Sequence, residues 1–139
     1  METNYGFIIE KTSRKIKQSL QKRFNDLQIY ITVDQWVILL ELSQQNGLAQ
    51  YEIAEKTNKD APTVNRIIEL LLQKELVIKS GNSEDKRKSI ICLSKKGMEL
   101  VANLQPEVIK FRREGWEKLN EKDLSDLKRI MQTIYNNFT

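Results

Sequence analysis

Hydrophobic residues recur with a helical period along most of the chain. They follow three- and four-residue spacing in residues 5–28, in residues 33–45 and in the stretch from Gln50 to Leu76. The last third continues the pattern through Val101, Leu104 and Val108, and then from Leu124 to Phe138. This periodicity predicts a mainly α-helical chain with few loops.

Two short segments depart from this period. Residues 77–80 and 89–93 are brief, contain β-branched side chains and are bounded by turn residues. The segment between them is polar, so the pattern predicts a β-hairpin with a long polar tip. Further on, Pro106 lies inside a helical pattern, and proline removes a helical hydrogen bond. We therefore expect a kink or an interruption near residues 102–105.

Helix starts are marked by capping residues. Thr32 and Gln35 stand at the spacing of a capping box, and Ile31 and Trp36 at that of a hydrophobic staple. The helix that follows is apolar on most sides, which is typical of a central buried helix. Asp60 is placed to cap a later helix.

The most informative stretch runs from Gln50 to Leu76. It predicts two helices joined by a polar turn, and the second helix has two faces. The apolar face consists of Val64, Ile67, Ile68 and Leu71. The polar face consists of Pro62, Thr63, Asn65, Arg66 and Glu69. Because Thr, Asn and Arg side chains reach base edges or phosphates, we predict that this helix enters a DNA groove.

Charge supports a nucleic-acid partner. The chain has 139 residues, a net charge of +4 and a pI of about 9.1. Residues 79–96 contain six basic and two acidic residues, so the net positive charge is concentrated at the hairpin. A helix–turn–helix followed at once by a basic hairpin is typical of a winged helix.

Composition argues against several other classes. The chain has no histidine and one cysteine, which removes the commonest general base and excludes a cysteine cluster for zinc. We expect no metal, no cofactor and no enzymatic activity. The first residues do not look like a signal peptide, and no window has the apolar length of a membrane span, so we expect a cytoplasmic protein. Cys92, beside isoleucines in the second strand, is predicted to be a buried, inert thiol.

Three motifs together resemble the MarR family of bacterial transcription regulators. Thr32 to Leu39 is similar to the start of the family's second helix. Residues 53–56 with Pro62 to Ile68 are similar to its DNA-reading head. Asp85-Lys86-Arg87, followed by residues 91–94 and Gly97, is similar to its wing and the next helix start.

This resemblance implies a mainly α fold, a winged helix–turn–helix with a two-stranded β wing and a helical dimerisation region. Residues 31–97 would form the DNA-binding region, and residues 1–30 and 98–139 the dimerisation region. The implied state is a homodimer on palindromic promoter DNA, acting as a repressor. Its interface would use the surplus apolar residues at both ends of the chain: Tyr5, Phe7, Ile8, Ile130, Ile134, Tyr135 and Phe138.

The resemblance also implies DNA-contact roles for the residues of this chain that match the family's motifs. Pro62, Thr63, Asn65 and Arg66 would face the major groove. At the wing, Arg87 would contact the minor groove or the backbone, Asp85 would orient its guanidinium, and Lys86 and Lys88 would contact phosphates. The family pattern differs at Glu75, where glycine often ends the reading helix, so we expect Glu75 in a left-handed conformation.

The resemblance also implies a pocket for a small effector, often aromatic or anionic, between the dimer core and the reading head. Phe24, Tyr30 and Trp36 are the candidates here, and ordinary core aromatics remain the alternative. For the whole chain, the alternative is a winged-helix module that binds protein and not specific DNA. Polar residues on the reading helix and the basic hairpin favour DNA.

Overall fold

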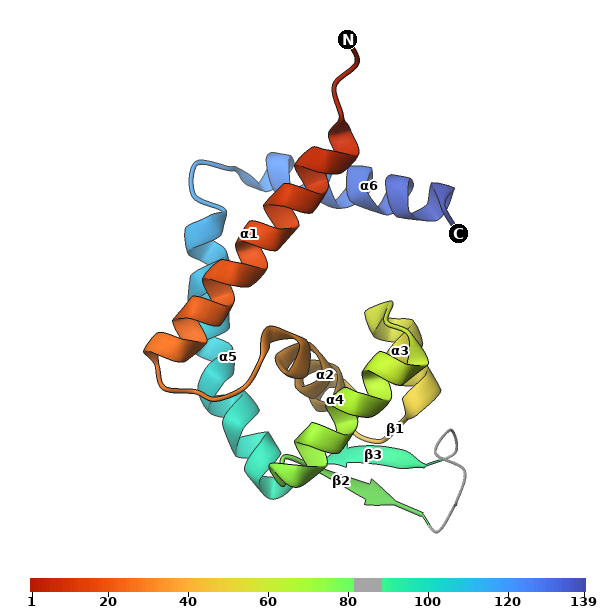
Figure 1. Cartoon of the computed structure of the whole chain (residues 1–139). Helices are drawn as coiled ribbons and strands as arrows, with labels where there is room; N and C mark the ends of the chain where they lie inside the picture. Colours follow the sequence, from red (N-terminus) through yellow and green to blue (C-terminus); the bar gives the residue numbers. More distant parts are fainter. Residues whose placement is uncertain (82–88) are drawn as a thin grey trace. The chain divides into compact units, whose positions relative to one another are not determined.

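The computed structural model describes residues 1–81 and 89–139. The chain divides into two compact units, Met1–Val108 and Ile109–Thr139. The first unit contains nearly all the elements, whose order along the chain can be followed in Figure 1. They are α1 (Tyr5–Asp26), α2 (Val33–Gln44), β1 (Leu48–Ala49), α3 (Gln50–Thr57), α4 (Ala61–Gln73), β2 (Val77–Ser80), β3 (Ile90–Leu93) and the larger part of α5 (Lys95–Gly115). The prediction of a mainly α winged helix is confirmed.

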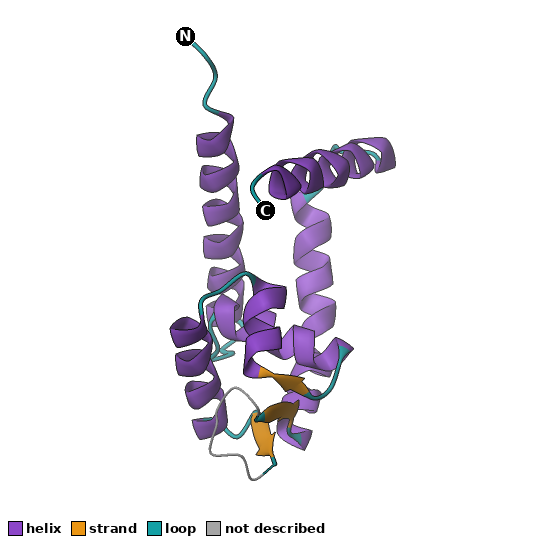
Figure 2. Ribbon diagram, turned by 90° about the vertical axis from the view of Figure 1, so that its right-hand side faces the viewer, coloured by secondary structure: helices purple, strands orange, loops and turns teal. Residues whose placement is uncertain are grey.

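The sheet has one strand more than the two-stranded wing that was predicted. Its antiparallel order is β1-β3-β2, with Leu48 opposite Ile91 and Val77 opposite Leu93. Figure 2 shows these strands as a small sheet in an otherwise helical chain. The extra strand is only two residues long, too short to show a two-residue period in the sequence. It extends the sheet on the far side of β3 from β2.

Helix α2 supplies much of the core. Ile38, Leu39 and Leu42 are fully buried, and Trp36 is 2% exposed. The predicted capping box is present: the Gln35 N–H donates to Thr32 Oγ1 at 3.0 Å, and the Thr32 N–H donates to Gln35 Oε1 at 3.1 Å. Gln35 is itself buried, so its side chain depends on these polar partners.

Pro106 does not interrupt α5, which is one helix from Lys95 to Gly115. The expected interruption was wrong. Proline removes one backbone donor, but its neighbours on the inner face, Val101, Leu104 and Val108, are all buried. Packing of this stripe offsets the lost hydrogen bond, a tertiary effect that local preference does not contain.

The prediction that Cys92 is buried was also wrong. Burial alternates along β3: Ile91 and Leu93 are buried, whereas Ile90 and Cys92 are partly exposed. The cause is the two-residue period of the strand, which sends successive side chains to opposite faces of the sheet. Cys92 is a free thiol on the less buried face.

Glu75 has a φ of 60°, which confirms the expected left-handed conformation after α4. Its side chain is exposed, while its carbonyl accepts a hydrogen bond from Ser94 Oγ at 2.6 Å. We expect Glu75→Gly to stabilise the fold by roughly 0.5–1 kcal/mol, since glycine adopts positive φ without Cβ strain. Urea unfolding measures this. Glu41→Gly, inside α2, should instead destabilise it, and a Glu75→Gly protein less stable than the wild type would contradict the assignment.

The second unit contains the end of α5 and α6 (Glu121–Asn137). Asn120 and Asp123 cap α6 reciprocally, with hydrogen bonds of 2.8 and 3.0 Å. No residue of α6 is buried, although Leu127, Ile130 and Met131 follow a helical stripe. The apolar face of α6 is therefore open to solvent in the single chain. Among the described helices, none is long and apolar enough to cross a membrane.

Candidate nucleic-acid interface

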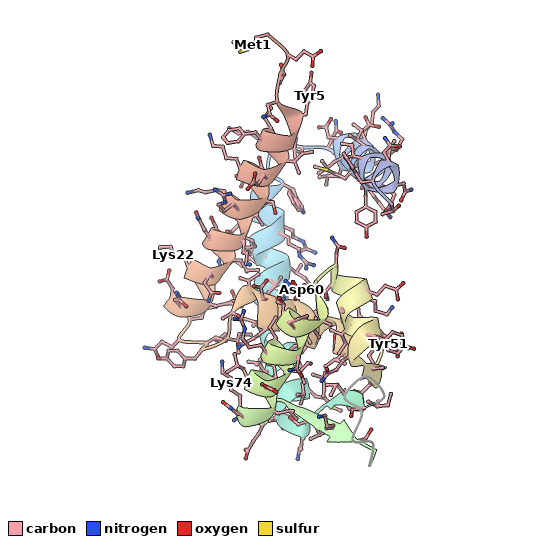
Figure 3. All side chains as sticks on the ribbon, turned by 45° about the vertical axis from the view of Figure 1, so that its right-hand side comes forward. Met1, Tyr5, Lys22, Tyr51, Asp60 and Lys74 are labelled. Carbon is pink, nitrogen blue, oxygen red and sulfur yellow. The ribbon has the colours of Figure 1, made fainter. Side chains whose placement is uncertain are left out.

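Helix α4 begins at a tight turn with a strong cap. Asn58, with a φ of 52°, ends α3, and Asp60 then accepts a hydrogen bond from the Thr63 N–H at 2.8 Å. Figure 3 shows Asp60 and Lys74 at opposite ends of α4. The side-chain and backbone hydrogen bonds of Thr63 lower the pKa of Asp60, so the cap is a carboxylate at neutral pH. A charged cap at this position stabilises the first turn.

The two predicted faces of α4 are present. Val64, Ile67, Ile68 and Leu71 are buried against the rest of the unit. On the other face, Pro62 and Arg66 are exposed, and Thr63 and Asn65 are partly exposed. All four predicted groove residues thus come from the first two turns of one helix. Their contact with DNA stays a prediction.

Asn65 is less free than its neighbours. Its Nδ2 donates to Glu69 Oε1 at 3.5 Å, and its Oδ1 is buried without a hydrogen-bond partner among the described residues. A bidentate contact to adenine needs both of these groups. Asn65 would therefore have to turn away from Glu69 to read a base.

A carboxylate fixes the turn before α4, a feature that sequence reasoning missed. Asp34, in the first turn of α2, binds Lys59 Nζ at 2.9 Å and Lys17 Nζ at 3.0 Å. It thereby joins α1, α2 and the α3–α4 turn. Partial burial alone would raise the pKa of Asp34, but hydrogen bonds and charge from Lys59 and Lys17 outweigh burial, and the pKa is lowered. Sequence separations of 17 and 25 residues carry no local signal for these contacts.

We expect Asp34→Asn to lower the free energy of unfolding at neutral pH by up to about 1 kcal/mol, as for a partly exposed ion pair. Because the folded-state pKa lies below the ordinary value of 3.8, this contribution is complete above that value. It is lost as the pH falls through the folded-state pKa. Urea unfolding from pH 7 to pH 3 measures the difference. A gap between variant and wild type that is independent of pH would contradict this role.

The other end of α4 is also tied to the start of α2. Lys74, the C-terminal cap, donates from Nζ to the Tyr30 carbonyl at 2.8 Å and to Gln35 Oε1 at 3.1 Å. Gln35 is the residue that completes the cap of α2. Both ends of the candidate reading helix are therefore held by polar contacts to the same short region.

The four predicted wing residues, Asp85, Lys86, Arg87 and Lys88, lie outside the described residues. Among the described residues, Ser80 pairs with Ile90 at the end of β2 and the start of β3. Their roles stay predictions.

The three candidate effector residues are not brought to one surface. Phe24 and Trp36 are buried in the core, where their rings meet edge to face with centroids 6.2 Å apart. Tyr30 is 79% exposed. The structure thus places two of them as core aromatics and the third at the surface, and ligand binding by any of them stays a prediction.

The predicted interface residues share one property, exposure of apolar surface. Tyr5, Phe7 and Ile8 at the start of α1 are all more than half exposed. In α6 and just beyond it, Ile130, Tyr135 and Phe138 are exposed, and Ile134 is partly exposed. Several large exposed apolar side chains on one helix are unusual for a monomer and are typical of interaction surfaces.

Comparison with known proteins finds similarity to transcription regulators. Residues 31–89 match the MarR family. The chain is 26% identical over 115 residues to the uncharacterized HTH-type transcriptional regulator YwoH of Bacillus subtilis, covering 83% of this chain and 82% of that protein. It is 24% identical over 103 residues to an uncharacterized HTH-type regulator of Staphylococcus aureus, covering 73% of this chain and 70% of that protein.

Solved structures share the fold. The S. aureus MepR–DNA complex has a TM-score of 0.87 at 24% identity, covering 99% of this chain and 100% of that one. BpsR of Bordetella bronchiseptica, whose DNA binding is regulated by 6-hydroxynicotinic acid, has a TM-score of 0.85 at 21% identity, with coverage of 96% and 99%. Each supports the winged-helix architecture described above.

Proposed function

We propose that the chain, whose residues 31–89 match the MarR family and which is similar to HTH-type transcriptional regulators, is a homodimeric repressor of promoter DNA. The observation that carries the proposal is α4, whose outward face presents Thr63 and Arg66 while both its ends are held by polar contacts. A reading helix must be rigid to place side chains on base edges. Arg66 is exposed near the middle of α4 and would make the principal contact to guanine or phosphate.

A second copy of the chain would cover the exposed apolar residues at the start of α1 and along α6. A helix with no buried residue and a continuous apolar stripe is not stable by propensity alone, so it requires a partner. A two-fold dimer would present two copies of α4 to two half-sites about one helical turn apart, on a palindromic operator.

Two structural relatives support DNA binding and its control. MepR was solved bound to DNA, and the DNA binding of BpsR responds to 6-hydroxynicotinic acid. By analogy, this chain would bind double-stranded DNA and release it when a small effector binds.

The test is binding to fragments of the promoter that precedes the protein's own coding sequence, measured by fluorescence anisotropy at two salt concentrations. We expect sequence preference, and an affinity that falls steeply with salt because lysine and arginine displace counterions from phosphates. Sedimentation of the same sample should give twice the 16.3 kDa chain mass. Binding with neither sequence preference nor a salt slope would favour the other winged-helix role, a module that binds protein.

A further inference from the structure

Leu70 is an apolar residue on the exposed side of α4. Its side chain is 40% exposed, whereas the four residues of the apolar stripe are buried. Within α4, all of which the structure describes, it is the only large hydrophobic side chain that is exposed. A single exposed leucine needs no explanation on an ordinary surface. On a helix whose outward face is proposed to bind DNA, its position bears on what that face can recognise.

Leu70 shares its side of α4 with two residues predicted to enter the major groove. At about 100° per residue, its side chain projects between those of Thr63 and Arg66, about 20° from the first and about 40° from the second. It follows Arg66 by about one turn, which is about 6 Å along the helix axis. Base pairs are about 3.4 Å apart, so a helix that places Arg66 on a base places Leu70 over the same groove about two base pairs away.

The side chains around Leu70 do not suit the DNA backbone. Glu69 precedes Leu70, Gln73 lies one turn further on, and both are exposed. Lys74, at the end of the helix, is held by its hydrogen bonds to the start of α2. A carboxylate is repelled by phosphates, so this turn fits the base edges better than the backbone. In the major groove, the apolar group that a base edge presents is the C5-methyl group of thymine.

We propose that Leu70 is a specificity-determining residue that contacts the C5-methyl group of a thymine in each half-site. This inference rests on the proposed DNA binding and adds to it a base that the operator contains. The contact removes apolar surface of the leucine and of the methyl group from water, which is the favourable contribution. It displaces no counterion from a phosphate, so it adds sequence preference without adding to the salt dependence.

Replacing thymine by deoxyuridine tests the contact, because deoxyuridine lacks only the C5-methyl group. The promoter fragment and a scrambled fragment are amplified with either dTTP or dUTP, and fluorescence anisotropy measures the affinity for each. We expect the wild type to bind the deoxyuridine promoter about fourfold more weakly for one half-site, the loss of one methyl contact, and about fifteenfold more weakly for two. Amplified DNA contains no methylated cytosine, so the methyl dependence measured in it comes from thymine.

Leu70→Ala separates the contact of Leu70 from every other effect of the methyl groups. We expect this variant to bind the thymine and deoxyuridine promoters within about twofold of each other, since the double substitution isolates the pairwise contact. Leu27→Ala is the matched control: it removes a leucine that is 43% exposed at the end of α1, and it should keep the wild-type ratio. Urea unfolding should show that Leu70→Ala keeps the fold, because alanine has a high helix propensity. A wild-type ratio in Leu70→Ala would overturn the proposal.

Leu70→Lys gives a second readout. A lysine replaces the apolar contact by a charge, so we expect the thymine preference to disappear and the salt slope to steepen by about 0.9 for each added charge. A thymine preference that survives in this variant would also refute the role of Leu70.

The two proposals fail in different ways. If the wild type bound the promoter no better than the scrambled fragment, the proposed function itself would be wrong. If it preferred the promoter but bound the thymine and deoxyuridine forms equally, only the role of Leu70 would be refuted.

Discussion

Gly97→Ala is expected to destabilise the first unit by about 3 kcal/mol, at the upper end of what overpacking costs. A Cβ at Gly97 would lie 2.0 Å from the carbonyl oxygen of Leu76. That oxygen cannot swing aside, because it accepts the Ser94 N–H at 3.1 Å where α5 begins. The clash is with backbone, so either α5 or the start of β2 has to move.

Urea unfolding of the wild type and of Gly97→Ala measures this loss of stability. Gly115→Ala is the matched control: both glycines are helical, but a Cβ at Gly115 meets nothing within 4 Å. Alanine has the higher helix propensity, so Gly115→Ala should be neutral or stabilising by up to about 1 kcal/mol. If Gly97→Ala unfolded at the same urea concentration as the wild type, the close approach of α5 to Leu76 would be refuted.

Arg66→Ala is expected to weaken promoter binding by about 1–3 kcal/mol and to relax sequence preference at one position. Arg66 is exposed on α4, and its side chain is not part of the buried stripe. The fold and the dimer should therefore be unchanged. Anisotropy against the promoter and against substituted fragments separates lost affinity from lost specificity.

Arg14→Ala serves as the control for Arg66→Ala. It removes the same charge from an exposed position on α1, where Arg14 pairs with Glu10. Its effect on DNA affinity should be small. If the two variants lost affinity equally and Arg66→Ala kept its sequence preference, Arg66 would be contributing general charge and not base contact.

The helical parts of the first unit were predictable because their signals are local. The Thr32–Gln35 cap, the Asp60 cap and the apolar stripe of α4 each depend on residues within one or two turns. The left-handed Glu75 was predictable for a similar reason, since a helix end followed at once by a strand requires a sharp change of direction. The residues predicted to face the groove follow from the same stripe, as the side of α4 that is not buried.

Pairing and packing between distant segments had no such signal. The two-residue strand β1 exists only because β3 lies beside it, and α5 stays whole at Pro106 because its inner face is packed. The contacts that hold α4, from Asp34 to Lys59 and from Lys74 to Gln35, span 25 and 39 residues. Single polar residues at such separations show no period, so only the tertiary structure reveals them.

By itself, then, the sequence determined the helical class of this protein, the two faces of α4 and the basic segment after it, since periodicity and capping act over a few residues. Only the tertiary structure decided that α4 is tied at both ends to the start of α2. It also decided that Phe24 and Trp36 pack in the core, and that Leu70 stays exposed. Those outcomes depend on which distant segments pack against one another and exclude water, and such packing is a property of the whole fold.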